Sequence, residues 1–380
     1  MRFSRIKLEN WRNFQEADVP LQNRAFLIGA NASGKSNFLD AFRFLRDIAT
    51  AGGGLQQSVV SRGGVSRIRC LAARRYSNVA VEVSLQEGEE QIWTYGIVFG
   101  QDNQRNPIIK EEKVVHGSEV ILSRPSKEDD ADPARLRQTH LEQTIANHAF
   151  RDIATFFRTI RYYHIVPQLV RDPERSLGRT ADPFGGDFLE QIARTNKRTR
   201  DARLRRILAA LKVAVPQLGD LRLRKDERGV PHLEGNYEHW HPRGAWQTER
   251  DFSDGTLRLM GLLWALLDGS GPLLLEEPEL SLHPGIVGQI PQLMWRAQRG
   301  RKARRRQVLL STHSSDLLRD EGIGADELLL VTPSEEGSTI QVGADIAEIR
   351  QALEAGLSPA EAAIPYTQPK DAAQLALFEI

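Results

Sequence analysis

Residues 29–36 read Gly29-Ala30-Asn31-Ala32-Ser33-Gly34-Lys35-Ser36 and match the pattern G-x-x-x-x-G-K-[ST] without a gap. An apolar run ending at Ile28 predicts a strand before this segment, and apolar residues at helical spacing predict a helix that starts at Lys35. The backbone N–H groups of such a loop curl around phosphate groups, and the positive end of the helix points at them. Lys35 would reach the β- and γ-phosphates, and Ser36 would supply a ligand for Mg²⁺. The segment therefore predicts an α/β domain that binds a nucleotide.

The segment 272–279, PLLLEEPE, places two carboxylates at the end of another apolar run. Such a run is typical of a buried parallel strand, and ligands bind beyond the carboxyl ends of strands in α/β sheets. Glu276 could hold Mg²⁺ directly or through water, and Glu277 could orient or polarise an attacking water. A glutamate pair after leucines is more often a surface turn, but beside a phosphate loop we favour the functional interpretation.

Two further segments carry polar groups at the ends of predicted elements. Residues 307–314, QVLLSTHS, predict a short buried strand, and His313 at its end could donate to a γ-phosphate oxygen, although a lone histidine is usually structural.

Residues 252–256, FSDGT, open a strongly apolar helix. Ser253 and Asp254 are typical helix caps, or the helix end is a second phosphate-binding position.

The segments GANASGKS, FSDGT, LLLEEPE, SLHP and STHS, in that order, resemble the head of an ATP-binding-cassette (ABC) ATPase. The resemblance is strongest to RecF-like and structural-maintenance-of-chromosomes (SMC)-like proteins and to predicted ATPases related to the overcoming-lysogenization-defect family. Residues 8–14, LENWRNF, resemble the opening L-x-N-F-R-x-F of that group, with Trp11 in place of Phe. The similarity covers about 1–100 and 246–342. It implies an α/β P-loop NTPase fold, an ABC ATPase head of the RecF type, with a mainly helical insertion.

The resemblance also implies a homodimer that encloses two ATP molecules and uses Mg²⁺. It assigns Glu277 as the catalytic carboxylate and His313 as the switch histidine, and it places Ser253 and Gly255 of the partner chain at the γ-phosphate. Residues implied to contact the nucleotide in the same chain are Arg12, Gly29, Asn31, Ser33, Gly34, Lys35, Ser36 and Asn37. The implied metal contacts are Ser36 and Glu276. No motif identifies the metal-contacting glutamine of the family, and we assign it to Gln168, which follows the strand-like residues 161–166. Glu276 replaces the more usual Asp, so we expect slow hydrolysis.

The pattern of elements predicts four parts. These are an ATPase lobe with the phosphate loop at 1–100, a mainly helical insertion with a hairpin at 101–245, a second lobe at 246–342, and a C-terminal helix and tail at 343–380. Strands are expected at 3–8, 24–28, 79–85 and 92–99. Within the insertion we expect helices at 134–157 and 188–213, a strand-like segment at 161–168 and a hairpin at 221–237.

Composition excludes several classes of protein. The chain has 380 residues, 40% of them hydrophobic, and a net charge of +1, which excludes an acidic disordered protein and a uniformly basic nucleic-acid coat. The one cysteine, Cys70, excludes an internal disulfide framework and a cysteine-rich zinc site. No apolar run approaches the ~20 residues of a membrane span, and the start lacks a signal peptide. We therefore expect a cytoplasmic protein without a membrane partner.

Two functions fit an ATPase of this kind. One is an ATP-gated dimer that binds duplex DNA in repair, recombination or surveillance, for which basic clusters at 194–206 and 301–306 could serve, although such runs are also common on solvated surfaces. The alternative is an ATP-dependent sensor or scaffold that controls a separate nuclease or toxin in anti-phage defence. Only residues 314–380 follow His313, too few for a nuclease domain of its own. A transporter motor ranks last, because FSDGT and EEPELSLHP depart from LSGGQ and DEPTSALD.

The C-terminal segment suggests one partner. Gln374, Leu375, Leu377 and Phe378 resemble the short peptide with which bacterial proteins dock on the replicative sliding clamp. The alternative, which we favour, is that this apolar tail packs on its own domain.

Overall fold

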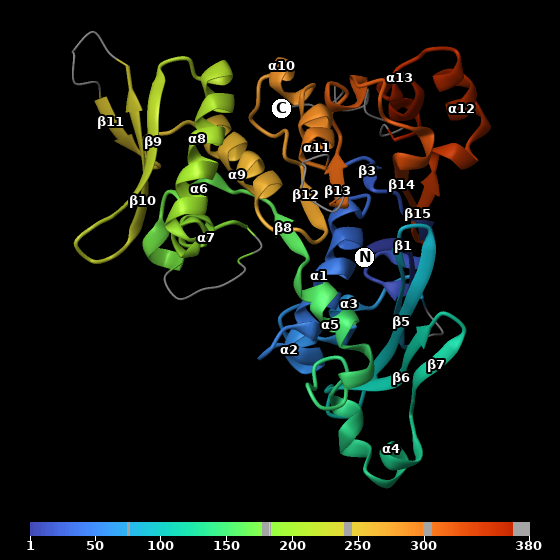
Figure 1. Cartoon of the computed structure of the whole chain (residues 1–380). Coiled ribbons are helices and arrows are strands. Elements are labelled where there is room, and N and C mark those ends of the chain that lie inside the picture. Colours follow the sequence, from blue (N-terminus) through green and yellow to red (C-terminus); the bar gives the residue numbers. More distant parts are fainter. Residues whose placement is uncertain (74–76, 177–181, 183, 239–244, 299–305, 368–380) are drawn as a thin grey trace, which may run out of the picture. The chain divides into compact units, whose positions relative to one another are not determined.

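The computed structural model describes residues 1–73, 77–176, 182, 184–238, 245–298 and 306–367 (Figure 1). The chain divides into two compact units. Unit 1 comprises Met1–Ile160, Ser270–Pro272 and Arg304–Ile380, and unit 2 comprises Arg161–Gly269 and Leu273–Ala303.

Unit 1 contains an antiparallel sheet in the order β2-β1-β4-β5-β6-β7, of which β1, β5, β6 and β7 are labelled in Figure 1. The predicted strands near 3–8, 79–85 and 92–99 are confirmed as β1 (Arg2–Trp11), β4 (Val79–Glu87) and β5 (Glu90–Gln101). Alternate residues of β1 and β4 are buried, as a sheet with one covered face requires. The remaining strands are β2 (Phe14–Pro20), β6 (Pro107–His116) and β7 (Glu119–Arg124).

Unit 1 also contains the strands β15-β14-β3-β13, adjacent in that order. The predicted strand at 24–28 is confirmed as β3 (Arg24–Ile28), which pairs in parallel with β13 (Val308–Thr312) and β14 (Leu328–Ser334), and β15 (Gly337–Val342) runs antiparallel to β14. Helix α1 (Lys35–Ala49) follows β3, and its Phe42 ring lies 4.9 Å from the ring of Phe3 on β1. The other helices of this unit are α2 (Gly54–Val60), α3 (Val65–Ile68), α4 (Lys127–Ala131), α5 (Arg151–Arg158), α12 (Ala347–Glu354) and α13 (Pro359–Ala363).

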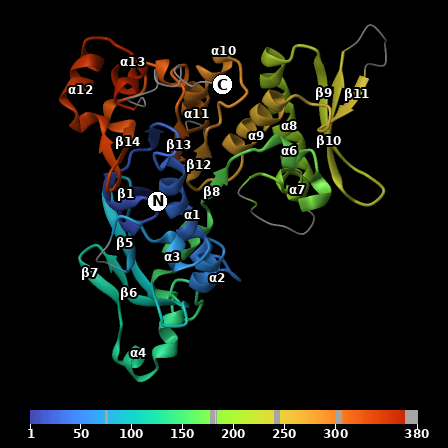
Figure 2. The ribbon, with the colours of Figure 1, turned by 180° about the vertical axis from the view of Figure 1, so that it is seen from behind.

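Unit 2 contains the parallel pair β8 (Arg161–Tyr163) and β12 (Leu273–Glu276), and the apolar helix α9 (Asp254–Leu267) (Figure 2). A separate antiparallel sheet has the order β11-β10-β9, formed by β9 (Leu218–Lys225), β10 (Pro231–Tyr237) and β11 (Ala245–Thr248). The hairpin predicted at 221–237 is β9 and β10. The other helices are α6 (Pro167–Val170), α7 (Phe188–Arg194), α8 (Lys197–Ala214), α10 (Pro284–Val287) and α11 (Ile290–Gln298).

The boundaries inside the chain differ from those predicted at residues 100 and 245. Residues up to Ile160 belong to unit 1, because β6 pairs with β5 and β7 with β6 and so extend the first sheet. Residues 161–245 belong to unit 2 together with α9 and β12. The predicted insertion at 101–245 is therefore divided between the two units.

The prediction of a single helix at 134–157 is wrong. Only α5 (Arg151–Arg158) is an α-helix there, and two short 3₁₀ turns, Pro133–Arg137 and His148–Phe150, precede it. The buried carboxylate of Glu112 on β6 accepts hydrogen bonds from the N–H groups of His140 and Leu141. A distant side chain thus takes the backbone donors that a helix would use.

Two other predicted segments are shorter than expected. The helix expected at 188–213 is divided into α7 and α8 at Asn196, whose side chain accepts from the N–H of Arg198 and caps α8. Of the strand-like segment 161–168, Arg161–Tyr163 forms a strand and Pro167 begins α6.

Some predictions concern residues that the structure does not describe. The segment 374–378, with Gln374, Leu375, Leu377 and Phe378, lies outside the described residues, and so do residues 301–305 of the second basic cluster.

Among the helices that are described, none combines the length and the apolar character needed to cross a bilayer.

Candidate functional site

The phosphate loop lies between β3 and α1, as its sequence predicts. Gly34 has φ of 110° and precedes the helix. A Cβ atom on Gly34 would lie 2.1 Å from Asn13 Nδ2, and one on Gly29 would lie 2.4 Å from the carbonyl oxygen of Val331. Both positions therefore require glycine, because a side chain at either would displace a neighbouring polar group.

The loop presents the groups that a triphosphate needs. Lys35 is 5% exposed, and its Nζ donates to the carbonyl oxygens of Gly29 at 2.8 Å and Ala30 at 3.0 Å. The first turn of α1 contains no acidic residue, so no carboxylate competes for its N–H groups. Among the described residues, Ser33 Oγ is buried without a hydrogen-bond partner. Asn31 and Ser36 lie exposed. An anion with its charge near Lys35 fits this set of donors.

Asn13, in the opening segment LENWRNF, holds the loop in place. Its Nδ2 donates to the carbonyl oxygen of Ser33 at 2.9 Å and to Ser338 Oγ on β15 at 2.6 Å. Its Oδ1 accepts from Asn37 Nδ2 at 2.8 Å, and Trp11 Nε1 donates to the carbonyl oxygen of Asn37 at 2.8 Å. In this structure the side chain of Asn37, predicted to contact nucleotide, bonds to Asn13. The sequence reasoning did not select Asn13, although it quoted the segment that contains it.

We expect Asn13→Ala to lower the affinity for ATP several-fold and the free energy of unfolding by about 1–3 kcal/mol, because partly buried donors and acceptors lose their partner. Calorimetric titration and thermal unfolding measure the two effects. Ser338→Ala is the matched control, since it leaves the bonds of Asn13 to Ser33 and Asn37 intact. Equal ATP affinity of Asn13→Ala and the wild type would contradict this role.

Arg12, predicted to contact phosphate, is engaged by α1. Its guanidinium forms an ion pair with Asp40 at 3.1 Å and donates to the carbonyl oxygen of Arg67 at 3.2 Å. Burial alone would raise the pKa of the Asp40 carboxyl, but the charge and hydrogen bonds of Arg62, with the charges of Arg43 and Arg12, lower that pKa. Asp40 therefore stays ionised and restrains Arg12 beside the loop.

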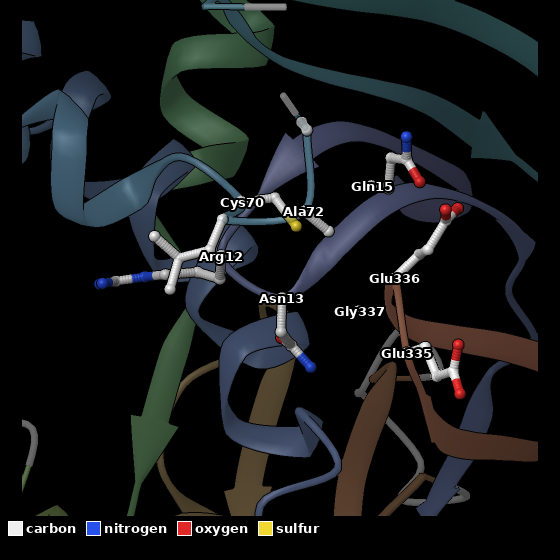
Figure 3. Close-up of a pocket in the computed structure, with 10 residues that line it drawn as sticks. Arg12, Asn13, Gln15, Cys70, Ala72, Glu335, Glu336 and Gly337 are labelled. Carbon is white, nitrogen blue, oxygen red and sulfur yellow. The ribbon is translucent and has the colours of Figure 1, made fainter. Parts of the chain in front are cut away.

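A hollow of about 580 Å³ in unit 1 lies beside Asn13. Figure 3 shows Arg12 on one side of it and the carboxylates of Glu335 and Glu336 on the other, with Asn13 between them. Two carboxylates repel a triphosphate, whereas the donors of the loop 29–36 attract it. The phosphate position is thus favoured at the loop and not in this hollow.

His313 lies at the same edge of the parallel strands as the loop. In the pairing of β13 with β3, Thr312 is opposite Ile28. The phosphate loop begins directly after Ile28, and His313 directly follows Thr312. The loop and His313 therefore follow the aligned ends of two neighbouring strands. His313 is exposed, whereas Ser311 and Thr312 are buried. Unit 1 thus brings together the loop and His313.

The two glutamates lie at the end of β12 in unit 2. The hydroxyl of Tyr162 donates to Glu276 Oε2, and His164 Nδ1 lies 3.3 Å from the carbonyl oxygen of Glu276. Glu277 has φ of 41°, which is uncommon for a residue other than glycine. Residues held in such conformations cluster at functional sites, where the surrounding structure maintains them.

The first turn of α9 lies against the segment that follows the glutamates. Ser253 Oγ accepts from the N–H of Thr256 at 3.2 Å, so the predicted cap is present at Ser253, and Asp254 is the first helical residue. A Cβ atom on Gly255 would lie 2.5 Å from the carbonyl oxygen of Ser281. Gly255 therefore permits the close approach of this helix end to the chain after β12.

Gln168 lies on α6 and is exposed. Its Nε2 is 3.4 Å from Asp254 Oδ2, and Arg171 forms an ion pair with Asp254 at 2.6 Å. Unit 2 thus brings Gln168 to the first turn of α9. Arg171 is a further charged residue at this helix end that the sequence reasoning did not select, and its place after Gln168 in the sequence was the available signal.

In the described part of the chain, no cluster of three or more His, Cys, Asp or Glu side chains could hold a metal ion. Mg²⁺ that accompanies a nucleotide does not need such a cluster, because phosphate oxygens and water supply most of its ligands. Ser36 and Glu276 supply oxygen atoms of the kind that Mg²⁺ prefers.

The fold and the phosphate loop define an ATPase domain of the AAA/SMC-like type. The chain belongs to the family described as "AAA domain, putative AbiEii toxin, Type IV TA system", which it matches over residues 24–320. The predicted P-loop fold and the resemblance to RecF- and SMC-like ATPases are confirmed.

This fold is shared by solved structures, among them two SMC heads. One is an SMC head bound to the C-winged helix domain of ScpA, with 13% identity, a TM-score of 0.56 and coverage of 90% of this chain and 98% of that chain. The other is the Smc head domain with an extended coiled coil bound to the C-terminal domain of ScpA, derived from Pyrococcus furiosus. It has 12% identity, a TM-score of 0.54 and coverage of 93% and 99%.

Similarity to a curated protein is local. The chain is 47% identical over 47 residues to the endonuclease GajA of Bacillus cereus (strain VD045). The match spans 12% of this chain and 8% of the length of GajA.

Proposed function

We propose that the chain binds Mg²⁺–ATP and hydrolyses it slowly, with two copies closing over two ATP molecules. The observation that carries the proposal is the phosphate loop, with buried Lys35 at the start of α1 and His313 at the same level on the neighbouring strand. Bound Mg²⁺ would neutralise charge that develops on the phosphates. Ser36 and Glu276 would hold it, with Gln168 as a third contact.

Each residue of the proposed site has a separate role in binding or hydrolysis. Gly29, Asn31, Ser33, Gly34 and Lys35 bind and orient the phosphates, and Arg12 and Asn37 support this loop. Glu277 accepts the proton of the attacking water, and His313 donates to the γ-phosphate. Ser253 and Gly255 of the second copy would complete the site from the first turn of α9, where Arg171 neutralises the charge of Asp254.

The test of this proposal is a calorimetric titration of the full chain with ATP in Mg²⁺ and in EDTA, followed by light scattering of the same samples. We expect one ATP per chain and a dimer in the presence of Mg²⁺–ATP. Absence of ATP binding would refute the ATPase proposal, and a monomer with ATP fully bound would refute the closed dimer.

We further propose duplex DNA as the partner of the dimer, on the evidence of α8 in unit 2. Arg198, Arg205 and Lys212 are exposed at intervals of seven residues, so they lie on one side of the helix, about 10 Å apart, and Arg206 is exposed beside them. None of these four forms an ion pair with any residue that the structure describes. Such a row of unneutralised cations suits the phosphates of a nucleic-acid backbone.

We expect Arg198→Glu combined with Arg205→Glu to weaken binding of duplex DNA and to make the dependence of log K on log salt shallower by about 2, because two phosphate contacts are lost. Fluorescence anisotropy at several salt concentrations measures both. Arg5→Glu with Lys7→Glu on β1 reverses two cations that acidic partners already neutralise, and this control should retain the wild-type slope. An unchanged slope of log K against log salt for the α8 variant would exclude this side of α8 as a DNA-binding surface.

The second candidate function is control of a separate effector, such as a nuclease or toxin, by the ATP-bound state. The family description and the local similarity to an endonuclease favour it. A native pull-down with the ATP-bound protein distinguishes the two. A stoichiometric partner, together with ATP turnover that does not respond to DNA, would replace the DNA proposal with this one.

A further inference from the structure

The strand β8 places Tyr162 beside Glu276. In the parallel pairing of β8 with β12, Tyr162 is opposite Leu274 and Tyr163 is opposite Leu275. Successive side chains of a strand point to opposite faces. Glu276, two residues after Leu274, therefore shares a face with Tyr162, and Tyr163 points to the other face.

Two groups near the end of β8 contact Glu276. The hydroxyl of Tyr162 donates to Oε2 of the carboxylate, and Nδ1 of His164 lies 3.3 Å from the backbone carbonyl oxygen. Tyr162 and Glu276 are both half-buried, so water competes with this hydrogen bond less than at an open surface. Tyr162 on β8 thus contacts one carboxylate oxygen of Glu276, and His164, directly after β8, contacts its main chain.

The side chain of Glu276 needs such a restraint. It has one more rotatable bond than the aspartate expected at this position, and each free rotor must be ordered when a ligand binds. A hydrogen bond to a carboxylate is stronger than one between neutral groups, so the phenol hydroxyl selects one side-chain conformation before the ligand arrives. We propose that Tyr162 is a positioning residue that orients the Glu276 carboxylate toward Mg²⁺ of the bound nucleotide. This inference rests on the proposed Mg²⁺–ATP site.

Tyr163 provides a matched control within the same strand. Its hydroxyl lies 3.2 Å from Gln191 Oε1 and 3.4 Å from Asp268 Oδ2, on the other face of the pair. Tyr162→Phe and Tyr163→Phe each remove one hydroxyl from neighbouring residues of β8. A general loosening of β8 would affect both variants alike, whereas a role in orienting Glu276 concerns Tyr162 alone.

The experiment compares the dissociation constant of a fluorescent ATP analogue in Mg²⁺ with that in EDTA, for the full chain. For Tyr162→Phe we expect the gain in affinity from Mg²⁺ to fall about 10-fold, the usual effect of removing a group that orients a metal ligand. The dissociation constant in EDTA should stay at the wild-type value. Tyr163→Phe should match the wild type in both conditions, and the thermal unfolding midpoint of Tyr162→Phe should match that of Tyr163→Phe.

A double-mutant cycle with Glu276→Gln makes the test specific. Once the carboxylate is gone, Tyr162→Phe should cause no further loss of the Mg²⁺ effect. Additive losses would overturn the inference, and so would a wild-type Mg²⁺ effect in Tyr162→Phe. If the wild type itself binds ATP equally in Mg²⁺ and EDTA, the proposed metal site fails and the inference fails with it. The wild-type control thus separates the two failures.

Discussion

Lys35→Ala is expected to abolish ATP binding. Lys35 is almost fully buried at the start of α1, and it donates to the carbonyl oxygens of Gly29 and Ala30, so its ammonium group is held within the phosphate loop. A unit charge about 4 Å from a phosphate charge contributes about 4 kcal/mol at an effective dielectric constant of 20, which corresponds to about 10³ in affinity. Calorimetric titration with Mg²⁺–ATP measures this loss.

The control for this variant separates charge from stability. Removing Lys35 also removes two hydrogen bonds to loop carbonyls, so the thermal unfolding midpoint must be measured alongside the affinity. Lys7→Ala, at a half-buried cation on β1 that pairs with Glu9, should retain wild-type binding. ATP affinity of Lys35→Ala equal to that of the wild type would refute the assignment of the loop.

Glu277→Gln is expected to retain ATP but to lower the turnover rate by about 10²–10⁴, because the amide cannot accept a proton from water. Glutamine has the same shape as glutamate, so the conformation at φ of 41° can be kept. With hydrolysis blocked, Mg²⁺–ATP should hold the dimer closed for longer than in the wild type. Phosphate release and light scattering measure the two effects.

The double variant of Lys35→Ala and Glu277→Gln supplies the control for the dimer. It should remain a monomer in Mg²⁺–ATP, since the closed state depends on bound nucleotide. A dimer in both variants would mean that association is independent of ATP. Wild-type turnover in Glu277→Gln would assign the proton acceptor to another residue.

The sequence was sufficient for the elements whose signals are local. The strands that end at Ile28, Glu276 and Thr312 are short, buried apolar runs, and α1 has its apolar residues at helical spacing. The prediction of one helix at 134–157 failed because Glu112, more than 20 residues earlier in the chain, binds the N–H groups of His140 and Leu141. No local pattern records such a contact.

The candidate site likewise has features that the sequence predicts and features that only the tertiary structure shows. The residue types at 29–36, 276–277 and 313 were readable from the sequence, since the chemistry of a phosphate loop requires glycine, lysine and serine at set positions. The alignment of Ile28 with Thr312, the support of the loop by Asn13 and the contact of Tyr162 with Glu276 came only from the tertiary structure. These contacts join segments that are far apart in the chain, and strand register and side-chain packing set them, not the propensity of any one segment.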